Sequence, residues 1–374
     1  MKKSSGMNFN MKDIVKELES DYNSMVKPNI MIAGKTGVGK STLINAIFRE
    51  KMVETGTGKP VTQHLQRISK DSVPVTLFDT KGLELTEIAR KEVRNEIVSE
   101  IEKREKSKDI NDHIHLMWYC ITYESYRIEK EEIEWIELFS KKMPVVLVLT
   151  QCFSDDISFY EQLKKMELPV KSIVRLLAAP KRIINNIEIP AYGLNNLVDV
   201  TFDALPDATK RAFVNAQKTN IDLKVKEAKK WSTGFIASSF GAGFTPIPFS
   251  DAVVLSGIQV TLITKITNIF GFPRSRSLIQ TIVTALAGTS VATLTGRALV
   301  GQLLKFIPGV GTVAGGLING AVASTITTSL AFAYIKVCEK LSYQTDIESM
   351  SETDIAEMVR EQYEKELKRN KGKS

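Results

Sequence analysis

The residues whose types and spacing could do chemistry begin with a glycine-rich loop near the N-terminus. The segment from Gly34 to Ser41 reads GKTGVGKS and fits the phosphate-loop pattern GxxxxGK[ST] in full. A strand pattern, Ile30–Ala33, precedes it and a helical pattern follows it, as this motif requires. In such a loop the glycines let backbone N–H groups surround phosphates, and the helix start adds partial positive charge. We therefore expect a nucleoside triphosphate to bind through Gly34, Lys35, Thr36, Gly37, Val38, Gly39, Lys40, Ser41 and Thr42.

Individual residues of this loop and of two later segments have expected roles. Lys40 would reach the β- and γ-phosphates, and the Ser41 hydroxyl would ligate Mg²⁺. In LFDTKG, Asp79 at a strand end would hold Mg²⁺ through water, and the Gly82 N–H would sense the γ-phosphate. In GKPVTQ, Thr62 is the expected switch threonine that closes on Mg²⁺ when the γ-phosphate is present. The predicted catalytic residues are thus Lys40, Thr62 and Gly82, and the predicted metal ligands are Ser41, Thr62 and Asp79.

Alternating strand and helix patterns would position these residues. Apolar strand patterns cover 29–33, 73–78, 114–122, 144–149 and 171–177. Helical patterns lie between and after them, at 41–50, 85–104, 127–141 and 195–205. Strands that alternate with helices predict a mostly parallel sheet with helices on both faces, which is an α/β fold.

Composition limits the class of protein. Of 374 residues, 43% are hydrophobic and 25% are charged, as in globular proteins, and the length allows two domains. Three cysteines without a CxxC pair favour a reducing compartment, and three histidines argue against a His-rich metal centre. The first residues, MKKSSGMNFN, contain no apolar stretch, so we expect no secretory signal peptide.

The sequence divides into four parts. An amphipathic helix occupies 1–27, the α/β pattern occupies 28–205, a charge-poor helical part covers 206–341, and a charged helix and tail cover 342–374. The helical part is expected to open with one polar amphipathic helix over 207–230.

The charge-poor part suggests contact with a membrane. Residues 306–335 contain no charge and are long enough to span a hydrocarbon core of about 30 Å, and 278–296 form a second charge-free run. Many Ser and Thr residues and five glycines between Gly309 and Gly320 oppose a permanent span. A helical hairpin would therefore fit either a soluble bundle or a membrane hairpin. Six basic residues and one acidic residue between Trp231 and Cys338 suit an anionic membrane surface better than nucleic acid.

Taken together, these motifs resemble a known family. The chain is similar to bacterial GTPases of the Era-like, translation-factor-related class, and more narrowly to those with a C-terminal YcjF-type helical domain of unknown function. The resemblance implies a Ras-like P-loop G domain that binds GTP or GDP with Mg²⁺, followed by an all-helical apolar domain often associated with membranes. It rests on Gly34–Phe48, Gly58–Gln63, Phe78–Glu84, Met117–Ile121, Ala191–Gln217 and Pro246–Gly271.

The guanine-selecting motif of this family is altered. Guanine selection normally rests on [NT]KxD at a strand end, and the matching residues here are Thr150, Gln151, Cys152 and Phe153. Thr150 fits the first position, and the stem of Gln151 could cover the base as Lys would. Phe153 stands where the Asp should be, and Asp155 or Asp156 could replace it only in a reshaped loop. Losing this contact would cost roughly 1.5–3 kcal/mol of base discrimination.

Two other family elements bear on base binding and on hydrolysis. A backbone N–H at Ala178 is the expected contact to guanine O6. Leu83 follows Gly82, where Ras-type enzymes place the Gln that orients water, and the adjacent Glu84 is more often solvated in such loops. Gly37 replaces the Asn that binds a stimulating potassium ion in some relatives. We therefore expect slow turnover.

The leading hypothesis is a slow Mg²⁺-dependent GTPase that acts as a nucleotide-controlled switch for an apolar, membrane-associating helical domain. One alternative is a membrane-remodelling or membrane-permeabilising effector gated by the G domain. Another is a P-loop ATPase or an NTPase with relaxed specificity. The expected partners are a guanine nucleotide, membrane lipid, and an activating protein or a nucleotide-dependent homodimer, and no nucleic acid. The expected location is the cytoplasm, at the cytoplasmic face of a membrane.

Overall fold

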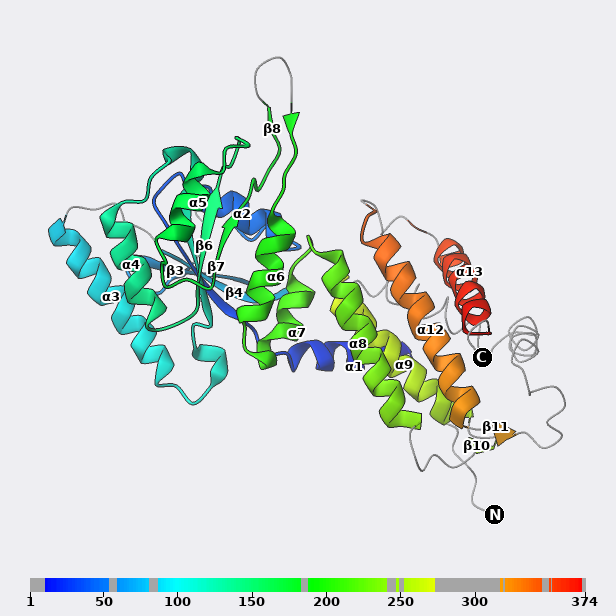
Figure 1. Ribbon diagram of the computed structural model, residues 1–374. Coiled ribbons are helices and arrows are strands. Elements are labelled where there is room, and N and C mark those ends of the chain that lie inside the picture. Colours follow the sequence, from blue (N-terminus) through cyan, green and yellow to red (C-terminus); the bar gives the residue numbers. More distant parts are fainter. Residues whose placement is uncertain are drawn as a thin grey trace. The chain divides into compact units, whose positions relative to one another are not determined.

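The computed structural model divides the chain into two compact units, Met25–Asn220 and the combination of Met1–Ser24 with Ile221–Ser374 (Figure 1). Gly82, Leu83, Glu84 and most of the charge-free runs lie outside the part that the structure describes. The described residues are 11–53, 59–80, 87–182, 188–240, 247–248, 252–272, 317–318, 320–344, 350 and 352–371.

The first unit is built on a seven-stranded sheet in the order β2-β3-β4-β1-β5-β6-β7. From β4 to β7 the neighbouring strands are parallel, and β2 and β3 join antiparallel at one edge. This arrangement confirms the predicted α/β fold. The strands are β1 (Asn29–Ala33), β2 (Lys59–Pro60), β3 (Leu65–Lys70), β4 (Val73–Thr80), β5 (Leu116–Thr122), β6 (Val145–Thr150) and β7 (Ser172–Arg175).

Helices cover both faces of this sheet, so its central strands read as continuous apolar runs. Helices α3, α4 and α5 pack on one face, and α2, α6 and α7 lie on the other (Figure 1). Their bounds are α2 (Lys40–Ile47), α3 (Glu87–Glu105), α4 (Lys130–Ser140), α5 (Ser158–Lys165), α6 (Leu194–Ala204) and α7 (Asp207–Ala216). Smaller elements are two 3₁₀ turns (Ile110–Asp112, Tyr123–Ser125) and the hairpin β8 (Lys181–Arg182) with β9 (Glu188–Ile189).

Strand β3 was not expected from the sequence. Its sequence, LQRISK, buries only Leu65 and Ile68, and its pairing with β4 is irregular at Ser69 and Lys70. A strand near the sheet edge buries less of its surface, so its apolar pattern is weak. Helix α5 also went unpredicted.

The single helix expected over 207–230 is two helices in the structure, α7 and α8 (Ile221–Phe240). Gln217 follows α7 with extended backbone angles. Its side-chain amide donates to the carbonyl of Asn220 at 3.0 Å and accepts from the Asn220 N–H at 2.9 Å. This closed pair replaces helical hydrogen bonds between the two helices, and that is why the prediction was wrong here.

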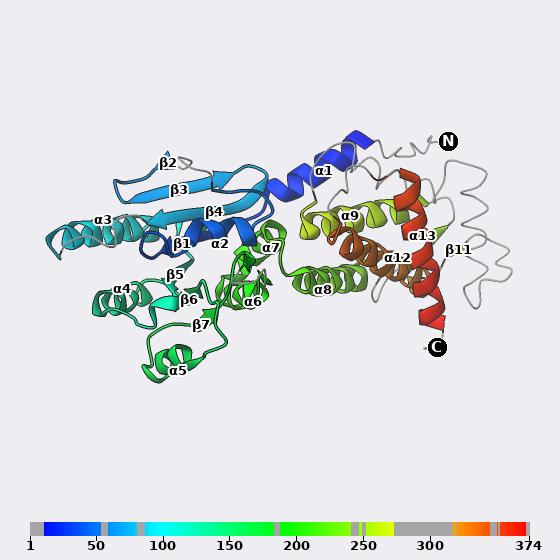
Figure 2. The same ribbon diagram turned by 90° about the horizontal axis from the view of Figure 1, so that it is seen from above.

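The second unit is helical and includes the N-terminal helix (Figure 2). Helix α1 packs against α9, α8 contacts α9 and α12, and α13 lies on α12. None of the described helices combines the length and the apolar character needed to cross a membrane. The remaining elements of this unit are α1 (Met11–Asn23), α9 (Ala252–Phe270), α12 (Gly320–Leu341), α13 (Glu352–Lys371), and the short pair β10 (Ile247–Pro248) and β11 (Leu317–Ile318).

Buried polar contacts fix the packing of these helices. The side chain of Lys224 on α8 is buried and donates to the carbonyl oxygens of Ile269 and Phe270 at 3.2 and 3.0 Å. These are the last carbonyls of α9, which a cation stabilises. Asn268 donates to the Asp21 carboxylate at 2.7 Å and so joins α9 to α1.

Replacing Lys224 with Met should destabilise the helical unit by about 2–3 kcal/mol, because the buried carbonyls at the end of α9 lose charged donors. Urea unfolding of the full chain followed by circular dichroism measures this change. The matched control is Lys226→Met, since Lys226 is exposed on the same helix and its loss should stay within about 0.5 kcal/mol. Equal midpoints for both variants would contradict the capping role.

Candidate functional site

The glycine-rich loop follows β1, which lies between β4 and β5 in the sheet. The carboxyl ends of these parallel strands meet at one edge, where ligands bind in open α/β sheets. Gly34, Gly37 and Gly39 have φ values of 137°, 85° and 91°, which side-chain-bearing residues rarely adopt. A Cβ on Gly34 would lie 2.2 Å from the carbonyl oxygen of Cys120 on β5. The loop therefore depends on glycine both for its backbone angles and for its contact with the sheet.

Lys40 folds back over the loop at the start of α2. Its ammonium donates to the carbonyls of Gly34 at 2.7 Å and Lys35 at 3.1 Å. The next residues, Ser41 and Thr42, are exposed in the first turn of α2. The structure thus brings a cation, a hydroxyl and a helix start together at the sheet edge.

The side chain of Lys35 contacts two carboxylates at the start of α4. Its ammonium lies 2.5 Å from Glu129 Oε2 and 3.6 Å from Glu132 Oε1. Burial acts to lower the pKa of Lys35, but the two carboxylates raise it overall. Lys35 therefore ties the loop to α4, and only its backbone is available to a phosphate in this geometry.

Asp79 lies beside the loop, as the sequence predicts for a residue at the end of β4. It pairs in register with Ile32 on β1, two residues before Gly34. Burial raises the pKa of the Cys120 thiol to about 12, Lys40 acts to lower it, and Asp79 acts to raise it. Both charges therefore lie close to Cys120, which is a buried thiol at the junction of the strands.

Thr62 lies in the turn between β2 and β3. The N–H groups of Val61 and Thr62 donate to the Leu65 carbonyl at 2.8 and 3.2 Å. Leu65 pairs with Thr80, so this turn lies at the same sheet edge as Asp79. The Thr62 hydroxyl is buried. In the same turn the His64 N–H donates to Glu96 of α3 at 2.9 Å, a contact that the sequence did not predict.

Thr150 and Gln151 connect the end of β6 to the loop. The Thr150 hydroxyl donates to the Val38 carbonyl at 2.6 Å and lies 3.0 Å from the Ile121 carbonyl. The Gln151 amide donates to the Gly37 carbonyl at 2.8 Å. The stem of Gln151 therefore extends along the loop, where the sequence expects it to cover a base.

Two charged residues surround Phe153, the residue that replaces the expected Asp. Its N–H donates to Glu124 Oε1 at 3.2 Å, and the Lys181 ammonium lies 5.2 Å from the centre of its ring. Sequence reasoning missed both residues because neither is near Phe153 in the chain. Asp156 is engaged elsewhere: its carboxylate accepts from the N–H and hydroxyl of Ser158 at 2.7 and 2.9 Å, which lowers its pKa.

Ala178 follows β7 next to the loop after β6. The N–H of Cys152 donates to the Leu176 carbonyl at 3.2 Å, and Leu177 pairs with Tyr192 through two hydrogen bonds of 3.1 Å. These bonds fix the segment before Ala178 against the residues after Thr150. The structure therefore brings the two predicted base-binding segments together.

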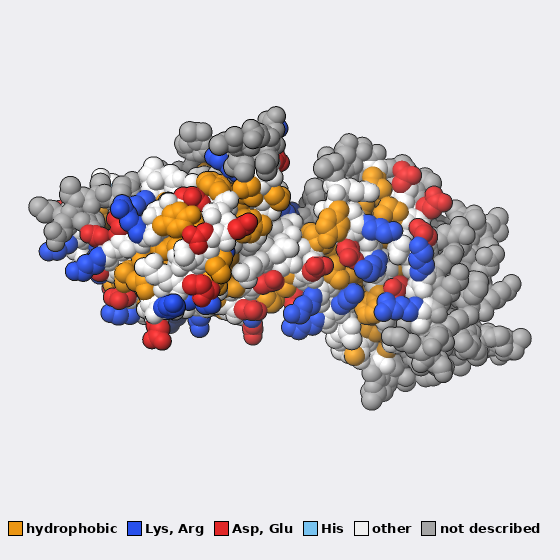
Figure 3. Space-filling model, turned by 45° about the horizontal axis from the view of Figure 1, so that its top comes forward, with side chains coloured by type: hydrophobic (Ala, Val, Ile, Leu, Met, Phe, Trp, Pro, Cys, Tyr) orange, Lys and Arg blue, Asp and Glu red, His pale blue; other side chains and the backbone are white. Residues whose placement is uncertain are grey.

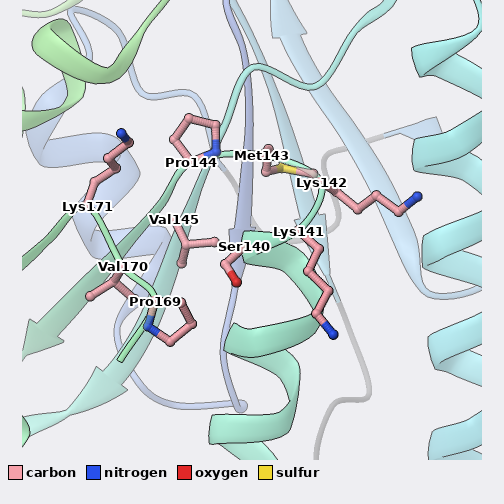
Figure 4. Close-up of a pocket in the computed structure, with 9 residues that line it drawn as sticks. All are labelled: Ser140, Lys141, Lys142, Met143, Pro144, Val145, Pro169, Val170 and Lys171. Atoms are coloured by element: carbon pink, nitrogen blue, oxygen red, sulfur yellow. The ribbon is translucent and has the colours of Figure 1, made fainter. Parts of the chain in front are cut away.

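A pocket elsewhere in the unit is separate from these residues (Figure 4). It lies at the amino end of β6, whereas the glycine-rich loop is at the opposite, carboxyl edge of the sheet. Among its lysines, Lys142 forms an ion pair with Glu102 at 2.9 Å. Its lining residues are Ser140, Lys141, Lys142, Met143, Pro144, Val145, Pro169, Val170 and Lys171.

Family matches agree with this geometry. Residues 29–151 match the 50S ribosome-binding GTPases. The first unit has the Ras-like P-loop GTPase fold. Residues 225–368 match a domain of unknown function (DUF697), so the GTPase domain is followed by a YcjF-type helical domain, as the sequence predicts.

The chain is similar to parts of several known proteins. It shares 28% identity over 131 residues with magnetosome membrane protein 22 of Magnetospirillum gryphiswaldense, covering 35% of this chain and 66% of that protein. It shares 36% identity over 85 residues with translocase of chloroplast 108 of Physcomitrium patens, covering 22% of this chain and 8% of that protein. This chain spans less than two thirds of the length of either relative.

Solved structures similar to the chain include a septin GTPase domain and Toc33. The septin GTPase domain of Chlamydomonas reinhardtii is 14% identical, with a TM-score of 0.32 and coverage of 44% of this chain and 85% of that one. Toc33 of Arabidopsis thaliana, in complex with Mg²⁺ and GMPPNP, is 16% identical, with a TM-score of 0.32 and coverage of 52% and 92%.

Alanine substitutions at two glycines of the loop should distinguish the free-energy cost of a steric clash from the cost of backbone strain. Gly34→Ala should cost about 3 kcal/mol or more, because its Cβ would overlap the Cys120 carbonyl in addition to the strain of a positive φ. Gly37→Ala meets open space and should cost about 1–2 kcal/mol from φ alone. Thermal unfolding of both variants checks the order, and an equal loss would contradict the close contact with β5.

Proposed function

We propose that this chain is a slow Mg²⁺-dependent GTPase of the Era-like class whose nucleotide state controls its helical unit. The observation that carries this proposal is the position of α2. One end of α2 carries the phosphate-binding residues, and the other end is bonded to the segment that leads into the helical unit.

The nucleotide end of the site supports binding of a triphosphate with its metal. Lys40 binds the β- and γ-phosphates, and the exposed Ser41 hydroxyl and the nearby Asp79 carboxylate are oxygen ligands of the kind that Mg²⁺ prefers. Thr62 and Gly82 complete the γ-phosphate contacts. When bound there, Mg²⁺ would neutralise charge on the phosphate oxygens.

Base binding follows from the loops after β6 and β7. Gln151 covers one face of the guanine, and the backbone at Ala178 binds its O6. Without an Asp at Phe153, discrimination of guanine depends on these contacts, which leaves an NTPase with relaxed specificity as the second candidate. Hydrolysis is slow because Leu83 cannot orient water, so an activating protein or a second copy of the chain completes the site.

At its other end, α2 continues into a short bridge. The Arg49 N–H donates to the Ala216 carbonyl at 3.1 Å, and the Lys218 N–H donates to the Ile47 carbonyl at 2.9 Å. The Lys218 ammonium also donates to the Asn45 carbonyl at 2.8 Å, near the C-terminus of α2. A cation at this position stabilises the end of a helix.

Side chains strengthen the same bridge. The Arg49 guanidinium donates to Asn215 Oδ1 and to the Ser72 carbonyl, each at 2.8 Å. Asn220 donates to the Asp199 carboxylate at 2.7 Å. The residue after Asn220 begins α8, so a shift of α2 on nucleotide exchange is transmitted to the first helix of the second unit.

The helical unit is the part of the chain that we expect the nucleotide state to control. Lys226, Lys229 and Lys230 are exposed on α8, and Lys and Arg side chains gather on one face of this unit (Figure 3). Such a surface suits anionic lipid at a cytoplasmic membrane face. The name of the magnetosome relative, a membrane protein, favours a membrane location. A membrane-remodelling or permeabilising effector is the alternative output, and leakage of liposomes caused by the full chain would favour it.

Equilibrium binding of GTP, GDP, ATP and XTP with Mg²⁺ tests the nucleotide assignment, with Lys40→Ala as the blank. We expect GTP and GDP to bind more tightly than ATP, and omission of Mg²⁺ to weaken GTP most. If ATP binds as tightly as GTP, the chain is an NTPase with relaxed base specificity. Binding no stronger than that of Lys40→Ala would overturn the proposal.

Hydrogen exchange tests the coupling through α2. In the wild-type chain, exchange of the amides of 216–224 should differ between the GDP and GTP-analogue states. Arg49→Ala should reduce that difference by about half or more while nucleotide affinity changes less than about threefold, since Arg49 follows the end of α2 that is opposite to Lys40 and Ser41. Arg67→Ala, an exposed arginine on β3, is the control. Identical exchange in the two nucleotide states would contradict the proposed switch.

A further inference from the structure

Glu124 brings a carboxylate to the segment that lacks the Asp of the [NT]KxD pattern. It lies in the 3₁₀ turn Tyr123–Ser125, directly after β5, and it is exposed. Its Oε1 accepts a hydrogen bond from the N–H of Phe153 at 3.2 Å. Phe153 stands at the position of that Asp, so the Glu124 carboxylate lies beside the backbone from which the missing side chain would extend.

The fold fixes the turn that carries Glu124. The residue before it, Tyr123, is fully buried, and its ring centre lies 5.7 Å from that of Phe159 on α5. On the other side of Glu124, the Ser125 hydroxyl lies 2.9 Å from the carbonyl oxygen of Thr122 at the end of β5. Because both neighbours are held, the backbone of Glu124 has little freedom to lose when a ligand binds.

Phe153 contacts a different neighbour with each of its parts. Its ring lies 5.2 Å from the Lys181 ammonium of β8, whereas its backbone N–H is directed to Glu124. Asp156, one of the two carboxylates that follow in the same loop, is bonded to the N–H and hydroxyl of Ser158. Glu124 is therefore the carboxylate that the structure brings to the backbone of Phe153.

The chemistry of guanine requires such a group. The edge of guanine that carries N1 and the 2-amino group presents only hydrogen-bond donors there, and an ionised carboxylate only accepts. Adenine has an acceptor at N1, which a carboxylate does not bind. A carboxylate beside the base therefore favours guanine over adenine, whichever residue of the chain supplies it.

We propose that Glu124 is a specificity-determining residue that replaces the missing Asp and accepts hydrogen bonds from N1–H and the 2-amino group of guanine. This inference rests on the proposed function, because it assumes that the base lies against the segments at Gln151 and Ala178. It adds a recognition group from the loop after β5, an element that does not contain the [NT]KxD pattern.

The test compares the affinities of the full chain for GTP, XTP and ATP with Mg²⁺. Xanthine keeps N1–H but carries an oxygen in place of the 2-amino group, so an amide can donate to it where a carboxylate cannot. Glu124→Gln should therefore lower the ratio of GTP to XTP affinity by about tenfold or more. Glu124→Ala should weaken GTP by about tenfold while ATP affinity changes less than about threefold.

Two further variants isolate the effect. Glu137→Gln removes an exposed carboxylate on α4 and should leave the GTP to XTP ratio unchanged. Asp155→Asn removes the rival carboxylate of the loop after β6. A GTP to XTP ratio that falls with Asp155→Asn and not with Glu124→Gln would overturn the inference. Equal losses of GTP and ATP affinity in Glu124→Ala would make Glu124 merely structural and overturn it as well.

The wild-type chain separates this inference from the proposed function. If it prefers GTP to ATP and Glu124→Gln leaves the GTP to XTP ratio unchanged, the inference fails and the GTPase assignment stands. If it binds GTP and ATP equally, the inference fails and the relaxed NTPase remains. If it binds no nucleotide more tightly than Lys40→Ala does, the proposed function fails together with the inference.

Discussion

The GTPase unit depends on the close fit of one glycine-rich loop against the strands beside it. Gly34 lies so near the Cys120 carbonyl that no side chain fits between them. Thr150 and Gln151 bond to the carbonyls of Val38 and Gly37 from another strand. The loop is therefore held by β5 and β6 as well as by its own sequence. A loop shaped in advance loses less entropy when a phosphate binds.

Helix α2, which follows the glycine-rich loop, is also held by close packing. Beyond its last turn, Phe48 is fully buried and stacks on Trp118 with ring centres 6.1 Å apart. Trp118 donates from its indole nitrogen to the Thr201 hydroxyl of α6 at 3.0 Å. An eight-residue helix fixed in this way moves as a rigid element, because close-packed contacts resist local bending. The proposed coupling between Lys40 and the bridge to Ala216 requires such rigidity.

The chain passes between the two units at two places in the sequence. Helix α1 belongs to the helical unit, so the chain enters the GTPase unit after Ser24 and leaves it after Asn220. Asn29, just inside the entry point, donates to the carbonyls of Asn111 and His113 at 2.6 and 2.7 Å. Both covalent connections are therefore anchored by hydrogen bonds to the sheet or to α2.

The sequence by itself determined the phosphate loop, the α/β class and the helical nature of the second part. These features are local: the spacing of Gly34, Gly39 and Lys40, and the periods of apolar residues, are visible within short windows. The sequence did not predict β3, because a strand near the edge of the sheet buries few side chains and therefore has a weak apolar pattern.

Only the tertiary structure decided the partners of the polar side chains. Glu96 with His64, Glu124 with Phe153, and Asp21 with Asn268 are separated by 32, 29 and 247 residues. The spacing of residues along the chain cannot predict such pairs. From the sequence alone, a charged residue on a helix is expected to be exposed to solvent, because the distant segment that packs beside it is not known. The same reason explains why α1 could be predicted as a helix from its pattern, while its place on α9 could not.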